Sequence, residues 1–431
     1  MASRDEARIP LLAGTDEYEA SQELLEDIQV EYAMRTPPRE VSGEHLTTGG
    51  GDIKRRKHYS GSEMIVAVFV VAFDTKKGNL VEWRYPEEVL LSGVEFKSMA
   101  SGLHNMQKDF IYFKQNQLFG LSCYVKIPVA NQEERGARMK CVGLLAVGYS
   151  NLHLHMDFLQ RQARILVETP GSYGSLEEYF RHYRSPAQVP HPLTGPEATN
   201  SVEACHPSGC FTTYLQFFGA SIFVLWKLAL LKKKIIFFSP PPVGALCHRV
   251  YCTCLLTSHV LPNDLNTECN PQFYVNVADI DAMTTMDSYV ACTTEKIFQI
   301  KTQLYDVFVD GERVTSNQER MDPLLRVNQC DEQRYEHLNH LRSNQRIASG
   351  RRSRNDELGF AEFFQELNCQ MFRTVMDAAS SEDHVLTMEM VESVGLDPLK
   401  DRQFLTELAS VYDLNMTVQR STSFDLLTCC M

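Results

Sequence analysis

Histidine side chains with metal-ligand spacing are the first groups in this 431-residue chain that could support chemistry. His153, His155 and Asp157 stand at alternating positions, as in an H-x-H-x-D-H metal motif, but Phe158 occupies the position that needs the last histidine. The string also lies where an expected strand leads into an expected helix. We therefore interpret it as a polar entry to a helix and predict no metal there.

A second group that could bind metal consists of Cys247, His248, Cys252, Cys254 and His259. Structural zinc sites hold paired ligands at spacings of two to four residues on turns. These five residues instead fall within one apolar, apparently helical stretch that has no second ligand pair nearby. The pattern favours core thiols with a histidine near the end of the helix, and no metal or other cofactor is expected.

Motifs for catalysis and for nucleotide binding are missing from the sequence. It contains no G-x-x-x-x-G-K-[ST] phosphate loop, no G-x-G-x-x-G at the start of a helix, no G-x-S-x-G elbow and no H-E-x-x-H. We predict no catalytic residue for bond chemistry, which favours a protein that acts by binding another macromolecule.

Composition narrows the class of protein further. With 44% hydrophobic and 23% charged residues, the chain is typical of folded soluble proteins, and its length predicts two or three domains. The 42 basic and 55 acidic residues give a net charge of −13, which argues against nucleic-acid binding. The odd count of 13 cysteines and an N-terminus without a signal-peptide pattern predict a reducing, cytoplasmic location without a disulfide framework.

Two segments raise the question of membrane attachment. Residues 211–231 are long and apolar enough to span a bilayer, but they contain Gln216 and Lys227, and a strand follows at once; we interpret them as a buried core helix. At the C-terminus, Thr428 occupies the position that prenylation requires to be cysteine. Palmitoylation of Cys429 or Cys430 and a frayed tail both stay open.

The elements that must position any site begin after a polar tail. Residues 1–60 are predicted to be disordered apart from a short acidic amphipathic helix over 16–34, and they include a basic run over 54–57. Residues 61–185 predict an α+β domain of five antiparallel strands. Its expected strands are 65–73, a second ending at residue 85, two around the turn at residues 115 and 116, and 141–149, with helices over 92–106 and 156–167.

A proline-rich linker over 186–206 separates this domain from an α/β layer over 207–330. That layer predicts helices over 215–231 and 246–258 and strands over 235–239, 272–277, 289–293, 298–300 and 304–309. Residues 331–431 predict a helical part, with helices over 332–346, 358–379 and 401–412 and a break over 347–357 that carries a second basic cluster.

Three strings in order resemble the DENN-domain family, and in particular its LCHN-type members. They are LVEWRYPEEV at 80–89, LWKLALLKKKIIFFSPPPVG at 225–244 and YVACTTEKIFQIKTQLYDVFVD at 289–310. The resemblance covers roughly residues 63–330 and implies a longin-like antiparallel α+β domain, then an α/β DENN module, then an all-helical C-terminal part. Family members are typically guanine nucleotide exchange factors that bind the switch regions of Rab-type GTPases between the first two lobes.

The resemblance implies a Rab-family GTPase as partner, with no nucleic acid and at most peripheral association with vesicle or organelle membranes. Two alternatives stay open. One is a GTPase-activating protein, for which Arg135 or Arg138 on the loop over 131–139 would supply an arginine finger. The other is a scaffold that binds a GTPase without changing its nucleotide. The sequence indicates neither the residues that contact the GTPase nor the oligomeric state.

Overall fold

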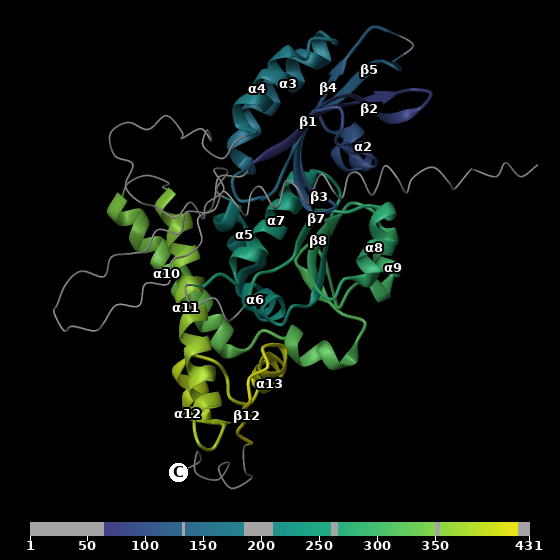
Figure 1. The fold of residues 1–431 in the computed structure, drawn as a ribbon. Coiled ribbons are helices and arrows are strands. Elements are labelled where there is room, and N and C mark those ends of the chain that lie inside the picture. The colour runs from purple at the N-terminus through teal and green to yellow at the C-terminus, as the bar shows by residue number, and fades with distance from the viewer. Residues whose placement is uncertain (1–63, 132–133, 185–209, 260–265, 350–353, 421–431) are drawn as a thin grey trace, which may run out of the picture.

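The computed structural model describes residues 64–131, 134–184, 210–259, 266–349 and 354–420. Ten of its strands form one continuous mixed sheet in the order β10-β9-β6-β8-β7-β3-β4-β5-β1-β2 (Figure 1). These strands are β1 Ile65–Asp74, β2 Gly78–Tyr85, β3 Lys108–Gln115, β4 Leu118–Pro128, β5 Ala137–Ala146, β6 Lys234–Phe238, β7 Pro271–Tyr274, β8 Tyr289–Thr293, β9 Val307–Asp310 and β10 Arg313–Thr315. The expected tail over 1–60 and its acidic helix, the linker over 186–206 and the cysteines at 429 and 430 lie outside the described residues.

The first half of the sheet is antiparallel, which confirms the five strands expected over 61–185. Its inner strands are buried on both faces. Glycine is required at two positions of this half, because the ring of Phe113 lies over Gly120 and the ring of Phe69 lies over Gly143. A Cβ at either glycine would lie 2.3 Å from the ring. The helix expected over 92–106 is two short helices separated by a turn. The helical elements of this half are α2 Val94–Ser98, η1 Leu103–Asn105, η2 Leu152–His155, α3 Met156–Glu168 and α4 Gly174–Tyr183.

In the second half of the sheet β7, β8, β6 and β9 run parallel, and β10 pairs antiparallel at the edge. Figure 1 shows α5 to α7 on one face of these strands and α8 and α9 on the other. The strand expected over 298–300 is wrong: these residues belong to α9, where Phe298 fills a small core against β6 and β8. The elements are α5 Cys210–Phe218, η4 Gly219–Ser221, α6 Ile222–Leu230, α7 Val243–Leu255, η5 Val277–Asp279, α8 Ile280–Thr285, α9 Ile297–Ile300 and η6 Thr302–Leu304.

The apolar stretch after the linker is two consecutive helices, α5 and α6, with a turn at Gly219. Among the described residues, Phe211–Leu230 is the segment whose length and composition would suffice for a membrane span, and most of it is buried inside the protein. Every residue of α6 is buried. The interpretation as a core helix therefore agrees with its packing.

The C-terminal part is mostly helical, but it is not all-helical as expected. It also contains a two-stranded parallel sheet, in which β11 Val385–Leu386 pairs with β12 Thr417–Val418. The break expected over 347–357 is shorter, since one helix continues to residue 349 and the next begins at residue 354. The helical elements are η7 Glu319–Leu325, α10 Gln329–Ser349, α11 Arg354–Ser380, α12 Met388–Ser393 and α13 Arg402–Val411.

The two halves of the sheet meet where β3 pairs with β7, through Phe113 and Tyr274. Beside this pairing, the carboxylate of Asp109 on β3 accepts hydrogen bonds from the backbone N–H groups of Val243 at 2.6 Å and Gly244 at 3.2 Å. These N–H groups begin α7, where a helix has unsatisfied donors and a partial positive charge. A side chain of the first half therefore caps a helix of the second half.

Gly244→Ala is expected to lower the free energy of unfolding by about 1–3 kcal/mol, the usual cost of overpacking. A Cβ at Gly244 would lie 2.8 Å from both Asp109 Oδ1 and the carbonyl oxygen of Phe110, so α7 would have to move away from β3. Urea unfolding measures the effect. Gly174→Ala, at the start of α4 with open space around it, is the control and should be neutral or slightly stabilising. Equal midpoints for the two variants would contradict this account of the junction.

Candidate functional site

The outer face of the junction between the two halves carries three large apolar residues that are exposed to water. Phe96 on α2, Val277 on η5 and Ile300 on α9 are 52%, 56% and 72% exposed. Figure 1 shows α2 and α9 on the same side of the molecule. Single exposed apolar residues are common, so these three are a candidate contact site only because the elements that carry them are neighbours. We call Phe96, Val277 and Ile300 the junction surface.

An ion pair and a hydrogen bond connect the elements of the junction surface. Lys97, which follows Phe96, places its Nζ 2.7 Å from Asp279 Oδ1 at the end of η5. The backbone N–H of Val277 donates to Glu295 Oε2 at 3.0 Å, and Glu295 precedes α9. The first half of the sheet thus contributes α2, the second half contributes η5 and α9, and these contacts make them neighbours.

The backbone around Val277 is held by a reciprocal cap. Asn276 accepts a hydrogen bond from the N–H of Ala278 at 2.9 Å, and its own N–H donates to Asp279 Oδ2 at 3.0 Å. Burial raises the pKa of Glu295, and the nearby negative charge of Asp279 raises it further. The hydrogen bond that Glu295 accepts from the N–H of Val277 acts in the opposite direction. A preorganised surface loses little conformational entropy when it binds. This arrangement suits contact with a folded partner and contains no nucleophile activated by a neighbouring base.

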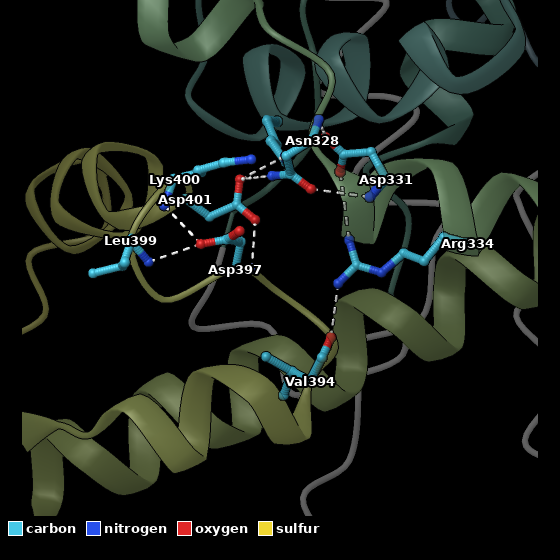
Figure 2. Close-up of polar contacts among 9 residues, drawn as sticks. Asn328, Asp331, Arg334, Val394, Asp397, Leu399, Lys400 and Asp401 are labelled. Carbon is cyan, nitrogen blue, oxygen red and sulfur yellow. Dashed lines mark hydrogen bonds and ion pairs between the residues drawn. The ribbon is translucent and has the colours of Figure 1, made fainter. Parts of the chain in front are cut away.

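A buried cluster of charges joins α6 to the C-terminal part. Lys227 Nζ lies 2.8 Å from Asp331 Oδ2 and 2.7 Å from Asp401 Oδ1. Asn328 donates to both aspartates, through its backbone N–H to Asp331 and through its side chain to Asp401, and Arg334 bridges Asp331 to the carbonyl of Val394 (Figure 2). Burial raises the pKa of Asp331 although Lys227 counteracts it. Each charged group has an oppositely charged partner within 4 Å, although Asp331 Oδ1 and Arg334 Nη1 are buried at 3.9 Å from each other without a hydrogen bond, and this pairing across distant segments indicates a structural role.

The two loop arginines have different environments. Arg138 makes two hydrogen bonds to the carboxylate of Glu134, at 2.6 and 2.7 Å, and a third to the carbonyl oxygen of Val167 at the end of α3. Arg135 is exposed at the tip of the β4–β5 hairpin and donates to the carbonyl oxygen of Thr75 at 3.2 Å. Arg138 is therefore engaged within the fold, whereas Arg135 could reach a partner.

The histidines of the metal-like string do not converge on a common point. His155 is buried, and its Nδ1 lies 2.6 Å from the hydroxyl of Tyr179 on α4. His153 Nδ1 lies 3.0 Å from the carbonyl oxygen of Ser150. Both histidines belong to η2, a helical turn that leads into α3, as the sequence interpretation expected. Their contacts fix the packing of α3 and α4.

The cysteine and histidine group of α7 is likewise dispersed. Cys247 Sγ lies 3.9 Å from Cys292 Sγ on β8, Cys252 is buried, and the ring of His259 packs near Phe372. Burial raises the pKa of the Cys292 thiol well above its ordinary value. Within the described parts of the chain, no group of three or more histidine, cysteine or acidic side chains could hold a metal ion.

Lowering the pH from 6.5 to about 4 is expected to destabilise the protein, because burial lowers the pKa of His155 and of His248 from 6.5 to about 4. In this interval the unfolded chain binds protons at these positions and the folded chain does not, so stability is lost as the pH falls. Each histidine contributes a slope of up to about 1.4 kcal/mol per pH unit. Urea midpoints across the interval should fall less steeply for His155→Asn than for the exposed control His340→Asn. Identical slopes would contradict this origin.

The junction surface has no recognisable signature in the sequence. Phe96 and Ile300 look like core residues, because an isolated apolar residue in a short helical segment gives no sign of which side faces water. Val277 follows a strand and was expected to be part of it. The one available signal was the charged residues next to two of them, Lys97 after Phe96 and Lys301 after Ile300, and it is weak.

Comparisons with known proteins identify what the chain is similar to. The family model described as DENN domain-containing protein 11 matches residues 68–321, which run from β1 to η7. A protein of that name from Xenopus laevis is 46% identical over 369 residues, 82% of this chain and 85% of that protein. Proteins of the same name from Danio rerio and Mus musculus are each 43% identical, over 84% and 82% of this chain and 78% and 82% of their own lengths.

Proposed function

Because this chain belongs to the DENN domain-containing protein 11 family, we propose that it is a cytoplasmic guanine nucleotide exchange factor for a Rab-type small GTPase. We assign β1 to β5 with α2 to α4 as the longin-like lobe. The strands β6 to β10 with their helices form the DENN module, and the segments from η7 onward form the downstream part. The junction surface is the proposed contact with the GTPase.

The proposal depends on the extent of the family match, which includes all ten strands of the sheet apart from the first three residues of β1 and also includes the junction surface. The surface is built from both lobes, since the ion pair between Lys97 and Asp279 links α2 to η5. The family resemblance implies that the GTPase binds between the first two lobes. Phe96, Val277 and Ile300 are the exposed apolar residues at that position.

Such a surface accelerates nucleotide release by differential binding. An exchange factor binds the nucleotide-free GTPase more tightly than the GDP-bound form, and so shifts the GTPase towards the conformation with distorted switch and magnesium contacts. A difference of about 5.5 kcal/mol moves a two-state equilibrium from 1:99 to 99:1. Buried apolar anchors supply most of the energy of protein contacts, and no covalent step is needed.

A screen of purified Rab proteins loaded with a fluorescent GDP analogue tests the proposal. Addition of this protein and excess unlabelled nucleotide should accelerate the loss of fluorescence for at least one Rab, in proportion to the protein concentration. If the protein leaves the rate of nucleotide release at its intrinsic value for every Rab in a broad panel, that result would count against exchange activity.

The exposure of Arg135 favours a second candidate, stimulation of GTP hydrolysis. An arginine finger stabilises the charge of the transition state and is worth about 10³–10⁵ in rate. If the protein acts as an exchange factor alone, the rate of phosphate release from GTP-loaded Rabs should be unchanged by it. Stimulation that is lost in Arg135→Ala and kept in Arg138→Ala would instead establish the GTPase-activating alternative.

A further inference from the structure

A cavity of about 670 Å3 opens between η7 and the start of α13, away from the junction surface. Three cationic residues line it: Arg326 after η7, Lys400 on the preceding loop and Arg402 at the first position of α13. Its volume falls within the range of about 300–1,000 Å3 that is typical of small-ligand sites. The cavity is therefore large enough for a phosphorylated headgroup.

The charge of the cavity is not balanced by the described part of the chain. Its one acidic lining residue is Glu407, which is already engaged by Lys233 Nζ at 2.6 Å and by the side chain of Gln403 at 2.8 Å. Arg326, Lys400 and Arg402 form no ion pair with another described residue, and Arg402 Nε is buried without a hydrogen-bond partner there. Unpaired cations around a cavity favour an anionic ligand.

The backbone adds to this positive field. Asp401 stands at the N-cap of α13, yet its side chain does not cap the helix. Its oxygens instead accept from Lys227 at 2.7 Å, from Asn328 at 2.9 Å and from the N–H of Asp397 at 2.9 Å. Because the side chain of Asp401 is engaged in the buried charge cluster, it does not cap α13. The N–H groups of the first turn of α13 therefore lie beside the three cations without a side-chain cap.

An apolar residue stands at the rim of the cavity. Leu399 is 59% exposed, and Figure 2 shows its side chain pointing away from the buried charges. Asp397 Oδ1 accepts hydrogen bonds from the N–H groups of Leu399 and Lys400, both at 2.9 Å, which holds the loop in a tight turn. A fixed apolar residue flanked by cations suits the boundary between lipid headgroups and acyl chains.

We propose that this cavity binds the phosphorylated headgroup of a phosphoinositide in a membrane, while Leu399 enters the lipid interface. Arg326, Lys400, Arg402 and the first turn of α13 contact the phosphate oxygens. A cation near an anionic membrane surface contributes roughly fivefold in binding, so three contribute about a hundredfold. The site is separate from the junction surface, so a membrane-bound molecule keeps that surface available to a GTPase.

Cosedimentation of the full chain with vesicles tests the inference. The chain should bind phosphatidylcholine vesicles that contain phosphatidylinositol bisphosphate more tightly than phosphatidylserine vesicles of equal charge density. Combining Arg326→Ala, Lys400→Ala and Arg402→Ala should weaken this binding about a hundredfold. Equal binding to both kinds of vesicle would overturn the assignment of a specific headgroup site.

Two further experiments are needed. One distinguishes an effect of the cavity residues from an effect of net charge, and the other distinguishes a headgroup in a membrane from a soluble ligand. The control combines Lys76→Ala, Lys77→Ala and Arg135→Ala at the hairpin tips, removes the same charge, and should leave binding unchanged. Leu399→Ser should weaken vesicle binding about tenfold without affecting binding of soluble inositol trisphosphate in calorimetry. An equal loss in the control, or vesicle binding that does not depend on Leu399, would overturn the inference. Circular dichroism confirms that each variant is folded.

Discussion

Replacing Lys227 with methionine is expected to lower the free energy of unfolding by about 3–5 kcal/mol, the usual result of removing one partner from a buried ion cluster. Lys227 has almost no exposed surface, and its ammonium group contacts Asp331 and Asp401. Methionine fills a similar volume but supplies neither charge nor donors. The two aspartates would then face each other with Arg334 as the remaining nearby cation, 3.9 Å from Asp331.

The pH dependence of this variant separates the loss of charge from a packing defect. Burial already raises the pKa of Asp331, and Lys227 opposes that rise, so removing Lys227 raises the pKa further. A carboxyl group with a raised pKa binds a proton more tightly in the folded state, so stability is lost as the pH rises through the interval above about 4. The deficit of Lys227→Met should therefore grow from acidic to neutral pH.

Lys233→Met is the matched control, because Lys233 is a nearby lysine, between α6 and β6, that also has an acidic partner in the C-terminal part, Glu407 on α13. Its ion pair with Glu407 is partly exposed, so the variant should cost less than about 1 kcal/mol. Urea unfolding followed by tryptophan fluorescence provides the measurement, since Trp226 is buried next to Lys227 and Trp83 reports on the first half of the sheet. Equal losses for the two lysines, or a deficit that does not change with pH, would contradict the structural role of the cluster.

Replacing Phe96 and Ile300 together with alanine is expected to abolish most of the exchange activity while leaving stability nearly unchanged. An apolar residue at the centre of a protein contact is worth about 2 kcal/mol or more when truncated, which is roughly 30-fold in affinity. The loss applies to kcat/KM, because the contact stabilises the nucleotide-free complex relative to the separate proteins. Both residues are more than half exposed, so the folded state loses little packing.

Ile165→Ala is the control for this pair, since Ile165 is 49% exposed on α3, away from the junction. Its exchange activity should equal that of the unchanged protein. Dose-response curves with the responding Rab give kcat/KM for each variant. Full activity in the Phe96 and Ile300 pair would place the GTPase contact elsewhere on the protein, even if exchange itself is confirmed.

Local sequence pattern predicted the elements of this fold well where burial is continuous along the chain. The apolar run of β1 and the segment of β8 were recognised because nearly every residue in them is buried. The strand predicted over 298–300 was wrong because two apolar residues on either side of a glutamine have the alternating period of a strand. In α9 only Phe298 is buried, and Ile300 faces water.

Contacts between distant segments could not be predicted in this way. Lys227 was noticed as a charge within an apolar helix, but its partners lie 104 and 174 positions further along the chain. Asp109 caps a helix that begins 134 positions later. The junction surface and the basic cavity both depend on such pairings, so one sequence alone predicts the helices and strands and not the sites that they form together.

The relative affinity of this protein for two forms of the responding Rab distinguishes an exchange factor from a scaffold. Calorimetric titration of the protein into nucleotide-free Rab and into GDP-bound Rab gives both dissociation constants. An exchange factor should bind the nucleotide-free form at least 100-fold more tightly than the GDP-bound form, a difference of about 2.7 kcal/mol. Equal affinities would contradict exchange activity, because a protein that binds both forms alike shifts no equilibrium and acts only as a scaffold.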